Sequence, residues 1–265
     1  MSRRLRLDAE LVRRGLARSR DQAADLIAAG RVAIAGQVAG KPASQVATDA
    51  PITVADDSSA PGYVSRGGTK LAGALAAFRR LTVAGKRCLD AGASTGGFTD
   101  VLLRAGASHV VAVDVGYGQL AWSLRSDERV TALDRVNVRT LRPEQVAPPP
   151  ALVVGDLSFI SLTLVLPALV ACAAPAADFV LMVKPQFEVG RDLVGGGVVR
   201  DPALRSAAVA NVAAAAADLG LGVEAVTASP LPGPAGNVEY FLWLRRGAPP
   251  LGDDALAAAV AAGPQ

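Results

Sequence analysis

From Val64 onward the chain alternates short apolar runs, each long enough for one strand, with longer stretches of helical pattern. This alternation is typical of a sheet of parallel strands joined by crossover helices. We therefore predict an α/β fold with a Rossmann-like sheet that is mostly parallel and whose last strand is antiparallel. The predicted strands are residues 87–90, 109–114, 130–133, 152–156, 179–184, 223–228 and 238–244.

The N-terminal segment differs from the rest of the chain in being strongly basic. Its first 31 residues hold eight arginines against four acidic residues, while the net charge of the whole chain is only +3. Such a basic end favours a polyanionic partner, although a solvated basic helix face is the alternative.

The same segment carries the pattern of a small α+β domain. Asp8 is expected to cap one short helix, and Ser19 with Gln22 matches a capping box for a second. Apolar residues then alternate around Ala35-Gly36, as they do in a hairpin. We predict a domain at residues 1–55 and a polar linker at 56–63.

The composition argues against secreted and membrane-spanning proteins. Two cysteines cannot form a disulfide framework. The basic N-terminus lacks the apolar core of a signal peptide. The most apolar stretch, residues 162–183, contains two prolines and Asp178, which a membrane-spanning helix would not carry. We therefore expect a cytoplasmic protein with no membrane partner.

The first predicted strand runs into a loop of small residues at 90–99. Small residues let the backbone turn sharply and approach a ligand, and the helix that follows presents its N-terminus to that ligand. Dinucleotide oxidoreductases also carry such a loop, so the loop alone is a weak signal. A methyl donor is favoured because the loop lacks the G-x-G-x-x-G spacing and because Asp90 precedes it.

Two further strand ends complete the predicted S-adenosylmethionine site. Asp114 ends the second strand, where a carboxylate suits the ribose hydroxyls of an adenosine ligand or of NAD. The segment that begins at Asp134, after the third strand, could approach the adenine. No metal site is predicted. The predicted cofactor-binding residues are Asp90, Gly92, Ser94, Gly96, Gly97, Phe98, Asp114, Val115 and Asp134.

Charged side chains end two adjacent apolar strands. Asp156 follows one strand and Lys184 follows the next, and in an open parallel sheet the carboxyl ends of strands form the ligand-binding edge. Glu239 lies near the start of the antiparallel last strand, so we expect it at the same edge. Lys70 lies on a helix predicted at 65–80. The chain has only four lysines, which raises interest in those at this edge.

Each of these side chains also has an ordinary structural interpretation. Lys184 and Asp156 could form a structural ion pair, Glu239 could be an exposed strand residue, and Lys70 a solvated helix residue. Charges at the ends of two buried strands are harder to explain in this way, because burying them is unfavourable unless they pair or act.

Lys70, Asp156, Lys184 and Glu239 resemble the Lys-Asp-Lys-Glu tetrad of the FtsJ-type RNA ribose methyltransferases. The chain as a whole resembles the TlyA (haemolysin A) family within that group, from about residue 4 to residue 246. The N-terminal segment resembles the RNA-binding domain named after ribosomal protein S4. The segments that carry the likeness are 6–8, 15–20, 30–32, 36, 41–42, 64–71, 90–99, 114–120, 156–161, 184–188 and 233–239.

One stretch departs from the pattern of the longer-form members. Those members carry an arginine and an aromatic residue before the valine, where this chain has Pro61-Gly62-Tyr63. Any special role of the linker is therefore in doubt here.

The resemblance implies S-adenosylmethionine-dependent methylation of a cytidine 2′-hydroxyl in 23S rRNA and, for the longer form that the complete N-terminal basic stretch resembles, also in 16S rRNA. It implies a catalytic domain at 64–246, a C-terminal tail at 247–265, ribosomal subunits as partners with no obligate protein partner, and a link to capreomycin and viomycin sensitivity. The RNA-binding residues that we expect are Arg4, Arg6, Arg14, Arg18, Arg20, Arg31 and Arg66.

Within the tetrad, Lys184 is the candidate acceptor of the hydroxyl proton, with Asp156 orienting it and Lys70 and Glu239 positioning the ribose and phosphate. An ordinary lysine is protonated at neutral pH, so Lys184 acts either as a base or as a cation that steers the oxygen. Three other functions stay open: a dinucleotide oxidoreductase, a membrane-active cytolysin and a non-catalytic RNA-binding factor.

Overall fold

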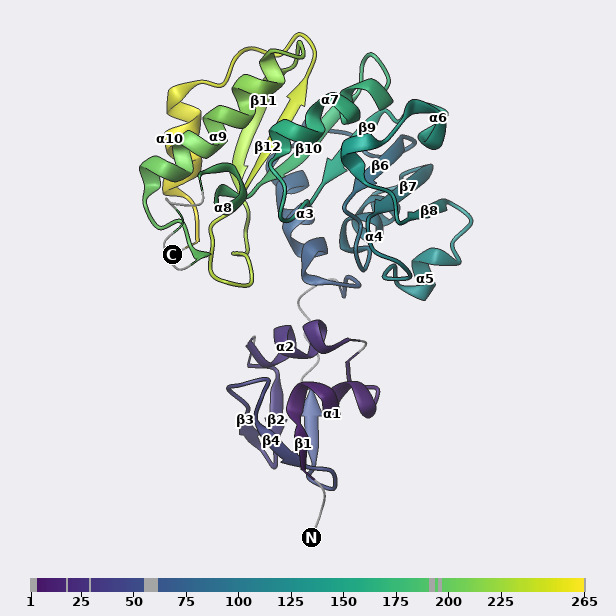
Figure 1. The fold of residues 1–265 in the computed structure, drawn as a ribbon, viewed down its shortest axis with the longest axis vertical. Coiled ribbons are helices and arrows are strands. Elements are labelled where there is room, and N and C mark those ends of the chain that lie inside the picture. The colour runs from purple at the N-terminus through teal and green to yellow at the C-terminus, as the bar shows by residue number, and fades with distance from the viewer. Residues whose placement is uncertain are drawn as a thin grey trace. The chain divides into compact units, whose positions relative to one another are not determined.

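The computed structural model describes residues 4–17, 19–28, 30–54, 62–190, 194 and 197–264, without the side chain of Asp21. The chain divides into two compact units, Met1–Gly62 and Tyr63–Gln265, and each is described by itself. Figure 1 labels their elements along the chain. Most of the predicted linker, and Arg18 among the predicted RNA-binding residues, lie outside the described residues.

Unit 1 is a small α+β unit with two short helices and two small antiparallel sheets. The helices are α1 (Leu7–Arg13) and α2 (Arg20–Ala28). One sheet pairs β1 (Arg4–Arg6) with β4 (Gln45–Ala47), and the other has the order β3 (Gln37–Val38), β2 (Val32–Ile34), β5 (Ile52–Val54). Its core consists of Leu7, Leu11, Ala17, Ala23, Ile27, Val32, Ala39 and Val46.

The local signals in unit 1 are confirmed at the second helix and the hairpin but not at the first helix. The Ser19 hydroxyl accepts a hydrogen bond from the Gln22 amide at 3.1 Å, and Ala35 and Gly36 form the hairpin turn with φ of 48° and 83°. The prediction that Asp8 caps α1 is wrong, because the helix begins one residue earlier, at Leu7. Asp8 is instead buried and binds arginines.

Unit 2 contains one seven-stranded sheet, which confirms the predicted fold class. The strand order is β11-β12-β10-β9-β6-β7-β8, and only the pairs that involve β12 are antiparallel. The strands are β6 (Arg87–Ala91), β7 (His109–Asp114), β8 (Val130–Asp134), β9 (Leu152–Gly155), β10 (Asp178–Val183), β11 (Gly222–Ala228) and β12 (Tyr240–Arg245).

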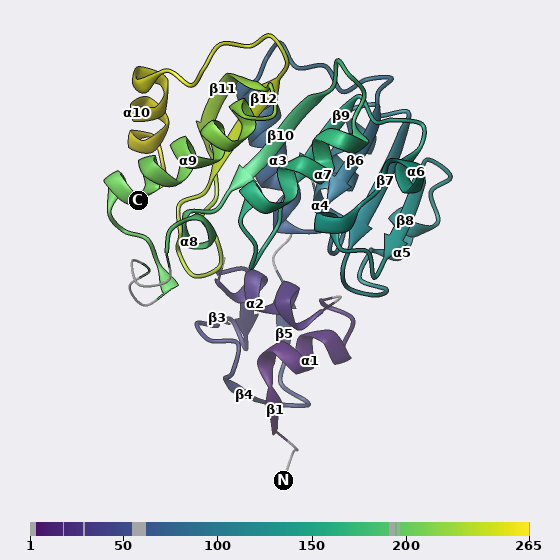
Figure 2. The ribbon, with the colours of Figure 1, turned by 45° about the horizontal axis from the view of Figure 1, so that its top comes forward.

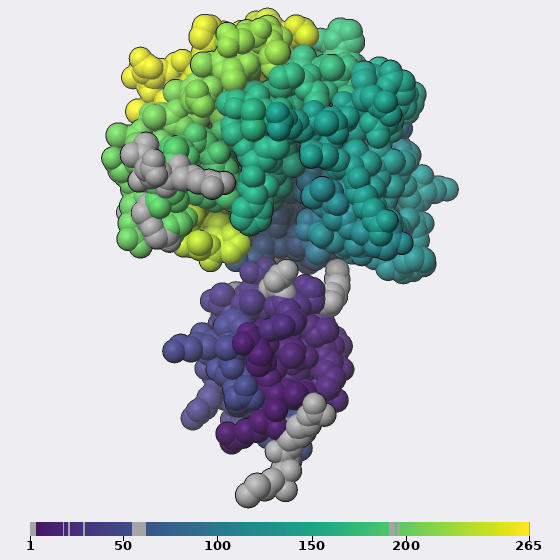
Figure 3. Space-filling model, viewed as in Figure 1, coloured from purple at the N-terminus to yellow at the C-terminus, as the bar shows by residue number. Residues whose placement is uncertain are grey.

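Helices cover both faces of this sheet (Figures 1 and 2). The inner strands are therefore buried on both sides, whereas the edge strands β8 and β11 are only partly buried. Successive residues of a strand point to opposite faces. In β10, Leu181 and Val183 join one core cluster, while Val180 and Met182 join the other. Figure 3 shows the atoms of unit 2 as a packed surface from the side seen in Figure 1.

The helices divide between the two faces. The clusters place α3, α4 and α5 on one face and α6, α7, α9 and α10 on the other. Their bounds are α3 (Arg66–Ala77), α4 (Gly97–Arg104), α5 (Trp122–Arg125), α6 (Pro143–Val146), α7 (Leu162–Cys172), α8 (Pro185–Glu188), α9 (Pro202–Ala217) and α10 (Asp253–Ala261), with a 3-10 helix η1 (Val138–Thr140).

The seven predicted strands are confirmed, with bounds that differ by at most two residues. The segment after Gly247 differs from the expected tail, because it contains α10, which packs on α9 and β11. Leu256 and Ala259 of α10 are buried in the same cluster as the sheet. Leu256 and Ala259 are three residues apart, so they lie on one face of the helix.

In the described residues, no helix is both long and apolar enough to cross a membrane. The same part of the chain holds no group of three or more side chains suited to binding a metal ion.

Candidate active site

The ends of three neighbouring strands bring Asp156, Lys184 and Glu239 to one edge of the sheet. β9 and β10 run parallel with Gly155 opposite Leu181, and Asp156 follows directly after β9. β10 and β12 run antiparallel with Val183 opposite Tyr240. Lys184 follows Val183 and Glu239 precedes Tyr240, so the two side chains leave neighbouring strands at the same level.

Lys70 reaches this edge from α3. Its Nζ donates a hydrogen bond to Glu239 Oε2 at 2.6 Å, across a sequence separation of 169 residues. The two side chains are only 8% and 1% exposed. Two opposite charges can be buried together at this depth because each neutralises the other, whereas either one alone would be very unfavourable.

Lys184 forms the second ion pair of the edge. Its Nζ lies 2.6 Å from Asp156 Oδ1 and donates a hydrogen bond to the hydroxyl of Ser158 at 2.8 Å. The contact with Asp156 is a close ion pair between a carboxylate and an ammonium group. The Asp156 carboxylate is the more exposed partner, at 23% against 10% for Lys184.

The loop of small residues between β6 and α4 packs against the elements that carry the tetrad. A Cβ at Gly97 would meet Ser65 Oγ and, at 2.7 Å, the backbone nitrogen of Gly68, both at the start of α3. Gly92 has a φ of +83°, and a Cβ there would lie 2.8 Å from the carbonyl oxygen of Asp156. We predicted that small residues serve the approach of a ligand. In the structure they also let this loop touch the segments that carry Lys70 and Asp156.

Asp90 is fully buried at the end of β6. Its Oδ2 accepts a hydrogen bond from the Thr99 hydroxyl at 2.7 Å, while Oδ1 has no partner. Burial raises the pKa of Asp90 to about 7, with smaller opposing effects from Thr99 and supporting effects from Asp156 and Asp114. An unpartnered carboxylate oxygen in this position can interact with a cationic or hydrogen-bonding ligand.

Asp114 ends β7 and connects two loops. Its Oδ2 accepts a hydrogen bond from the Ser94 amide at 2.8 Å, and its Oδ1 accepts one from the Gly116 amide at 2.7 Å. Ser94 has a φ of +48°, which this hydrogen bond helps to hold. Each carboxylate oxygen can accept a further hydrogen bond, so Asp114 can still receive the hydroxyls of a ribose.

The other predicted cofactor-binding residues differ in their surroundings. Val115 is 72% exposed beside the loop, whereas the Asp134 carboxylate forms an ion pair with Arg125. Phe98 is 2% exposed and packs on Phe241 in the core, with ring centroids 6.0 Å apart. The Phe98 side chain is therefore part of the core, which leaves the backbone of Phe98 as its part nearest to a ligand in the loop, and its role in cofactor binding stays a prediction.

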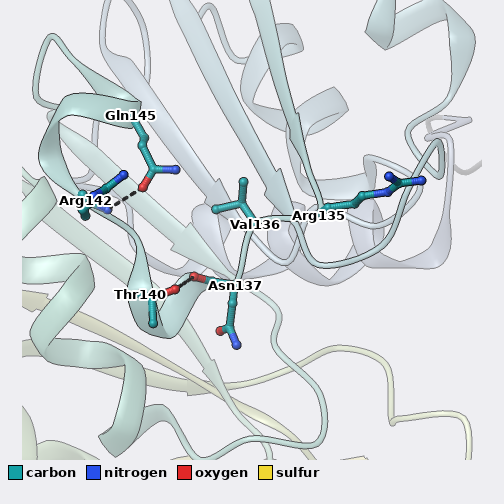
Figure 4. A pocket seen from close by; sticks show the side chains of 6 residues that line it. All are labelled: Arg135, Val136, Asn137, Thr140, Arg142 and Gln145. Carbon is teal, nitrogen blue, oxygen red and sulfur yellow. Dashed lines mark hydrogen bonds between the residues drawn. The ribbon is translucent and has the colours of Figure 1, made fainter.

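A shallow pocket lies beside the end of β8, and none of the four tetrad residues lines it. Asn137 Oδ1 accepts a hydrogen bond from the Arg139 amide at 3.0 Å, and this fixes the turn into η1. Figure 4 shows Arg142 and Gln145 on one side of the pocket and Arg135 on the other. None of the lining residues is acidic, so the pocket suits an anionic group. They are Arg135, Val136, Asn137, Thr140, Arg142 and Gln145.

The basic helical face of unit 1 is built on two buried carboxylates. Asp8 contacts Arg6 at 2.8 Å and Arg20 at 3.0 Å, and it leaves their side chains 46% and 59% exposed. The hydrogen bond from Arg6 is the main reason why the pKa of Asp8 lies well below its usual range. Glu10 holds Arg13 and Arg14 in the same way. Hydrogen bonds from these guanidiniums, chiefly that of Arg13, lower the pKa of Glu10 to about 2.

The predicted RNA-binding arginines therefore fall into different environments. Arg4, Arg6 and Arg20 are exposed, and Arg31 and Arg66 are half-buried. Arg66 donates to the carbonyl of Pro232 at 3.3 Å. Arg14 donates to the carbonyls of Ala50 and Thr48 at 2.7 and 3.0 Å as well as to Glu10, so it stabilises the fold of unit 1.

Two residues at the edge of the sheet were not predicted from the sequence. Ser158 binds Lys184, and Glu188 accepts a hydrogen bond from Ser161. Both lie in segments that carry the family likeness, 156–161 and 184–188, but a polar residue near a strand end gives no signal of its partner. Their contacts depend on how residues 156–161 and 184–188 pack against each other. This packing could not be predicted from the sequence pattern.

Comparison with known proteins agrees with this architecture. Residues 63–246 match the FtsJ-like methyltransferase family, and residues 5–52 match the S4 domain. A Mycobacterium tuberculosis protein named 16S/23S rRNA (cytidine-2′-O)-methyltransferase TlyA is 64% identical over 92% of this chain and 91% of its own length. Hemolysin A of Brachyspira hyodysenteriae is 38% identical, covering 89% of this chain and 98% of its own length. The solved structure of a presumed hemolysin from Streptococcus thermophilus superposes with a TM-score of 0.79 at 37% identity, covering 98% and 96% of the two chains.

Proposed function

Because the chain belongs to the FtsJ-like methyltransferase family and carries an S4 domain, we propose that it methylates the 2′-hydroxyl of a cytidine in ribosomal RNA. The observation that carries this proposal is the convergence of the two ion pairs, Lys70–Glu239 and Lys184–Asp156, at the ligand-binding edge of the sheet. The relative from M. tuberculosis is named for this reaction on 16S and 23S rRNA.

S-adenosylmethionine would supply an electrophilic methyl group on a sulfonium, and the residues beside the edge fit it. The unpartnered Oδ1 of Asp90 is a buried acceptor that a positively charged methyl donor would satisfy. Asp114 offers the remaining lone pairs of its carboxylate to ribose hydroxyls. The loop of small residues at 90–99 is here called the cofactor loop. The close approach of Gly92 to the backbone of Asp156 brings this loop next to the tetrad.

The tetrad would bind the ribose of the RNA and assist deprotonation of its 2′-hydroxyl. The 2′-hydroxyl would have to lose its proton when its oxygen accepts the methyl group that the cofactor would supply. Lys184 is the group placed to receive or stabilise that proton, and Asp156 holds it in place. Lys70 and Glu239 would fix the position of the ribose, since alignment of the reacting atoms supplies much of the rate in such transfers.

An exposed aromatic side chain beside the Lys184–Asp156 pair supports a nucleotide as the acceptor. Phe159 is 92% exposed and has a φ of +64°, although an apolar side chain gains nothing from water contact. Its ring lies 5.2 Å from that of Phe187, which follows Lys184 along the chain. A base taken out of its stack can lie on such a ring while its ribose meets the tetrad.

The test is transfer of a labelled methyl group from S-adenosylmethionine to isolated ribosomal subunits, followed by mass mapping of 2′-O-methylated nucleotides. We expect one or more methylated cytidines with the wild-type protein and none with Lys184→Ala. Lys86→Ala is the matched control, because Lys86 pairs with Asp178 at the start of β10, at the other end of the strands. Absence of any labelled RNA with the wild-type protein would refute the proposal. The antibiotic link implied by the resemblance stays a prediction.

A further inference from the structure

A carboxylate outside the tetrad lies one helical turn after Lys184. Glu188, the last residue of α8, accepts a hydrogen bond from the Leu162 amide at 2.8 Å through Oε1 and one from the Ser161 hydroxyl at 2.5 Å through Oε2. Both donors belong to the first turn of α7. Glu188 therefore caps a helix from a different part of the chain.

Residues 156–161, here called the rim loop, are held at both of their ends by residues 184–188. At the first end, Lys184 binds Asp156 and donates to Ser158 at 2.8 Å. At the far end, Ser161 binds Glu188. Between them the ring of Phe159 contacts that of Phe187. The rim loop thus has two polar attachments to one short segment, and one of them is the Lys184 ion pair.

The segment opposite the rim loop is itself well fixed. Lys184 ends a central strand of the sheet, and the carbonyl of Lys184 accepts the amide of Phe187 at 2.9 Å. Val189 likewise donates to the carbonyl of Pro185 at 3.0 Å. Glu188 is consequently a stationary attachment point, and the rim loop is the part that would move if this attachment were lost.

Burial of the Glu188 carboxylate at the start of α7 is energetically unfavourable. Burial raises the pKa of Glu188, and the hydrogen bonds from Leu162 and Ser161 oppose this effect only partly. An anion at the start of a helix gains from the helix dipole and from charge-assisted hydrogen bonds. These gains explain how the carboxylate is tolerated, but any N-cap residue on α7 itself would give a similar benefit to the helix. Ser161 already accepts the Thr163 amide at 3.2 Å.

We propose that Glu188 is a positioning residue for methyl transfer, which fixes the rim loop from its far end and so keeps Ser158 and Asp156 against the ammonium group of Lys184. The proposal rests on the proposed function for the reaction itself. Ser158 is the link between the two attachments, because it lies on the loop that Glu188 fixes and accepts a hydrogen bond from Lys184. With the far end released, Lys184 keeps its place on β10 but loses the fixed direction of its partners.

A positioning role and a purely structural capping role of Glu188 predict different kinetics. Glu188→Ala removes both hydrogen-bond acceptors, and we expect kcat to fall by about tenfold or more, because small misplacements of reacting groups have large effects on rate. KM for S-adenosylmethionine should stay within about twofold, since the cofactor is not placed at Glu188 or on the rim loop. Glu188→Gln keeps an oxygen for the Leu162 amide, and its amide can donate to the Ser161 oxygen, so kcat should recover to within about threefold of wild type.

Amide hydrogen exchange provides a second measurement that needs no activity. In Glu188→Ala we expect faster exchange in residues 156–163 and unchanged exchange in the cofactor loop, 90–99. Glu188→Gln should exchange like the wild-type protein. Glu224→Ala is the matched control, because Glu224 is an ion-paired carboxylate on β11 with no contact to the rim loop. Ser161→Ala removes the hydroxyl that binds Glu188, together with the bonds of that hydroxyl to Thr163, but leaves the hydrogen bond from the Leu162 amide to Glu188. It keeps the test usable if Glu188→Ala fails to fold.

The outcomes distinguish this proposal from the proposed function. If the wild-type protein transfers no methyl group, the proposed function fails, and the exchange data alone decide whether Glu188 fixes the rim loop. If the wild-type protein is active and Glu188→Ala keeps kcat within twofold, or if its rim loop exchanges at the wild-type rate, the positioning role is overturned. Equal loss of kcat in Glu188→Gln and Glu188→Ala would overturn it as well.

Discussion

Lys184 and Glu239 face each other across neighbouring antiparallel strands, each one residue beyond the pair Val183–Tyr240. Each has its own counterion, Asp156 for Lys184 and Lys70 for Glu239. Two lysines and two carboxylates therefore alternate at one edge of the sheet, and their formal charges cancel. This arrangement keeps four ionised groups stable in a largely buried place and also allows each pair to be tested separately.

The Lys70–Glu239 pair should contribute to stability as well as to activity. In Lys70→Met the Glu239 carboxylate is left buried without a partner, which should lower the free energy of unfolding by about 3–5 kcal/mol. Adding Glu239→Gln should restore much of this loss while activity stays absent. Urea unfolding of the single and double variants measures both effects. A single variant as stable as wild type would contradict the burial argument.

Lys184→Arg separates the two roles considered for Lys184. A guanidinium does not release its proton, and its planar fork does not reproduce an ammonium held between Asp156 and Ser158 at 2.6 and 2.8 Å. We expect the rate of methyl transfer to fall as far as in Lys184→Ala. Full activity in Lys184→Arg would rule out the base role and leave a steering cation. Single-turnover kinetics gives the rate of the chemical step itself.

The raised pKa of Asp90 predicts a pH-dependent stability. In the unfolded chain this carboxyl titrates near its ordinary value of 3.8, whereas in the folded protein it titrates near about 7. Between these values the folded state holds a proton that the unfolded chain has lost, so stability should fall as pH rises from 4 to 7 and then level off. Asp90→Asn keeps an acceptor for Thr99 and should lack this fall. Denaturant unfolding at pH 4.5, 6 and 8 compares the two proteins, and parallel curves would contradict the prediction.

Gly97→Ala should disturb the contact between the cofactor loop and α3. The added methyl group would collide with Ser65 Oγ and with the backbone of Gly68, so we expect a loss of about 1–3 kcal/mol in stability. Activity should fall further, because the same shift moves Lys70. Gly252→Ala is the control, since a Cβ there meets nothing within 4 Å. Thermal unfolding and methyl transfer are the measurements, and an unchanged melting temperature would refute the close contact.

The arginines held by Asp8 should contribute electrostatically to RNA binding. Arg6→Ala and Arg20→Ala should each weaken binding to ribosomal RNA and reduce the slope of log affinity against log salt by about one. Arg14→Ala should instead lower the melting temperature of unit 1, because Arg14 donates to the carbonyls of Ala50 and Thr48. Binding measured at several salt concentrations tests this division. An unchanged salt slope in Arg6→Ala and Arg20→Ala would exclude these residues from the RNA contact.

The sheet could be predicted from the sequence because its inner strands are buried on both faces. Continuous apolar runs such as residues 152–155 leave few alternatives to a central parallel strand. The positions of Asp156 and Lys184 followed from the same runs. α10 was missed because an alanine-rich stretch after Gly247 gives little evidence of what it packs against, and its burial comes from α9 and β11. The burial of the Phe98 side chain could not be predicted, because the position of a residue in the motif does not tell which way its side chain points.

Contacts between loops were not predictable in the same way. Nothing in the spacing of residues 156–161 or 184–188 indicates that Glu188 reaches the first turn of α7. A side chain that caps a helix from another segment depends on tertiary packing alone. For the same reason the hydrogen bond from Lys184 to Ser158 could not be predicted, because no periodicity of the sequence indicates it.

The last strand of the chain, β12, lies inside the sheet between β11 and β10 and not at its margin. During synthesis the sheet therefore has an open gap until residues 240–245 have left the ribosome, and Glu239 arrives only with them. A chain that stops short of this point lacks a quarter of the tetrad and exposes the edge of β10. We therefore expect C-terminal truncations into β12 to yield aggregating rather than partly active protein.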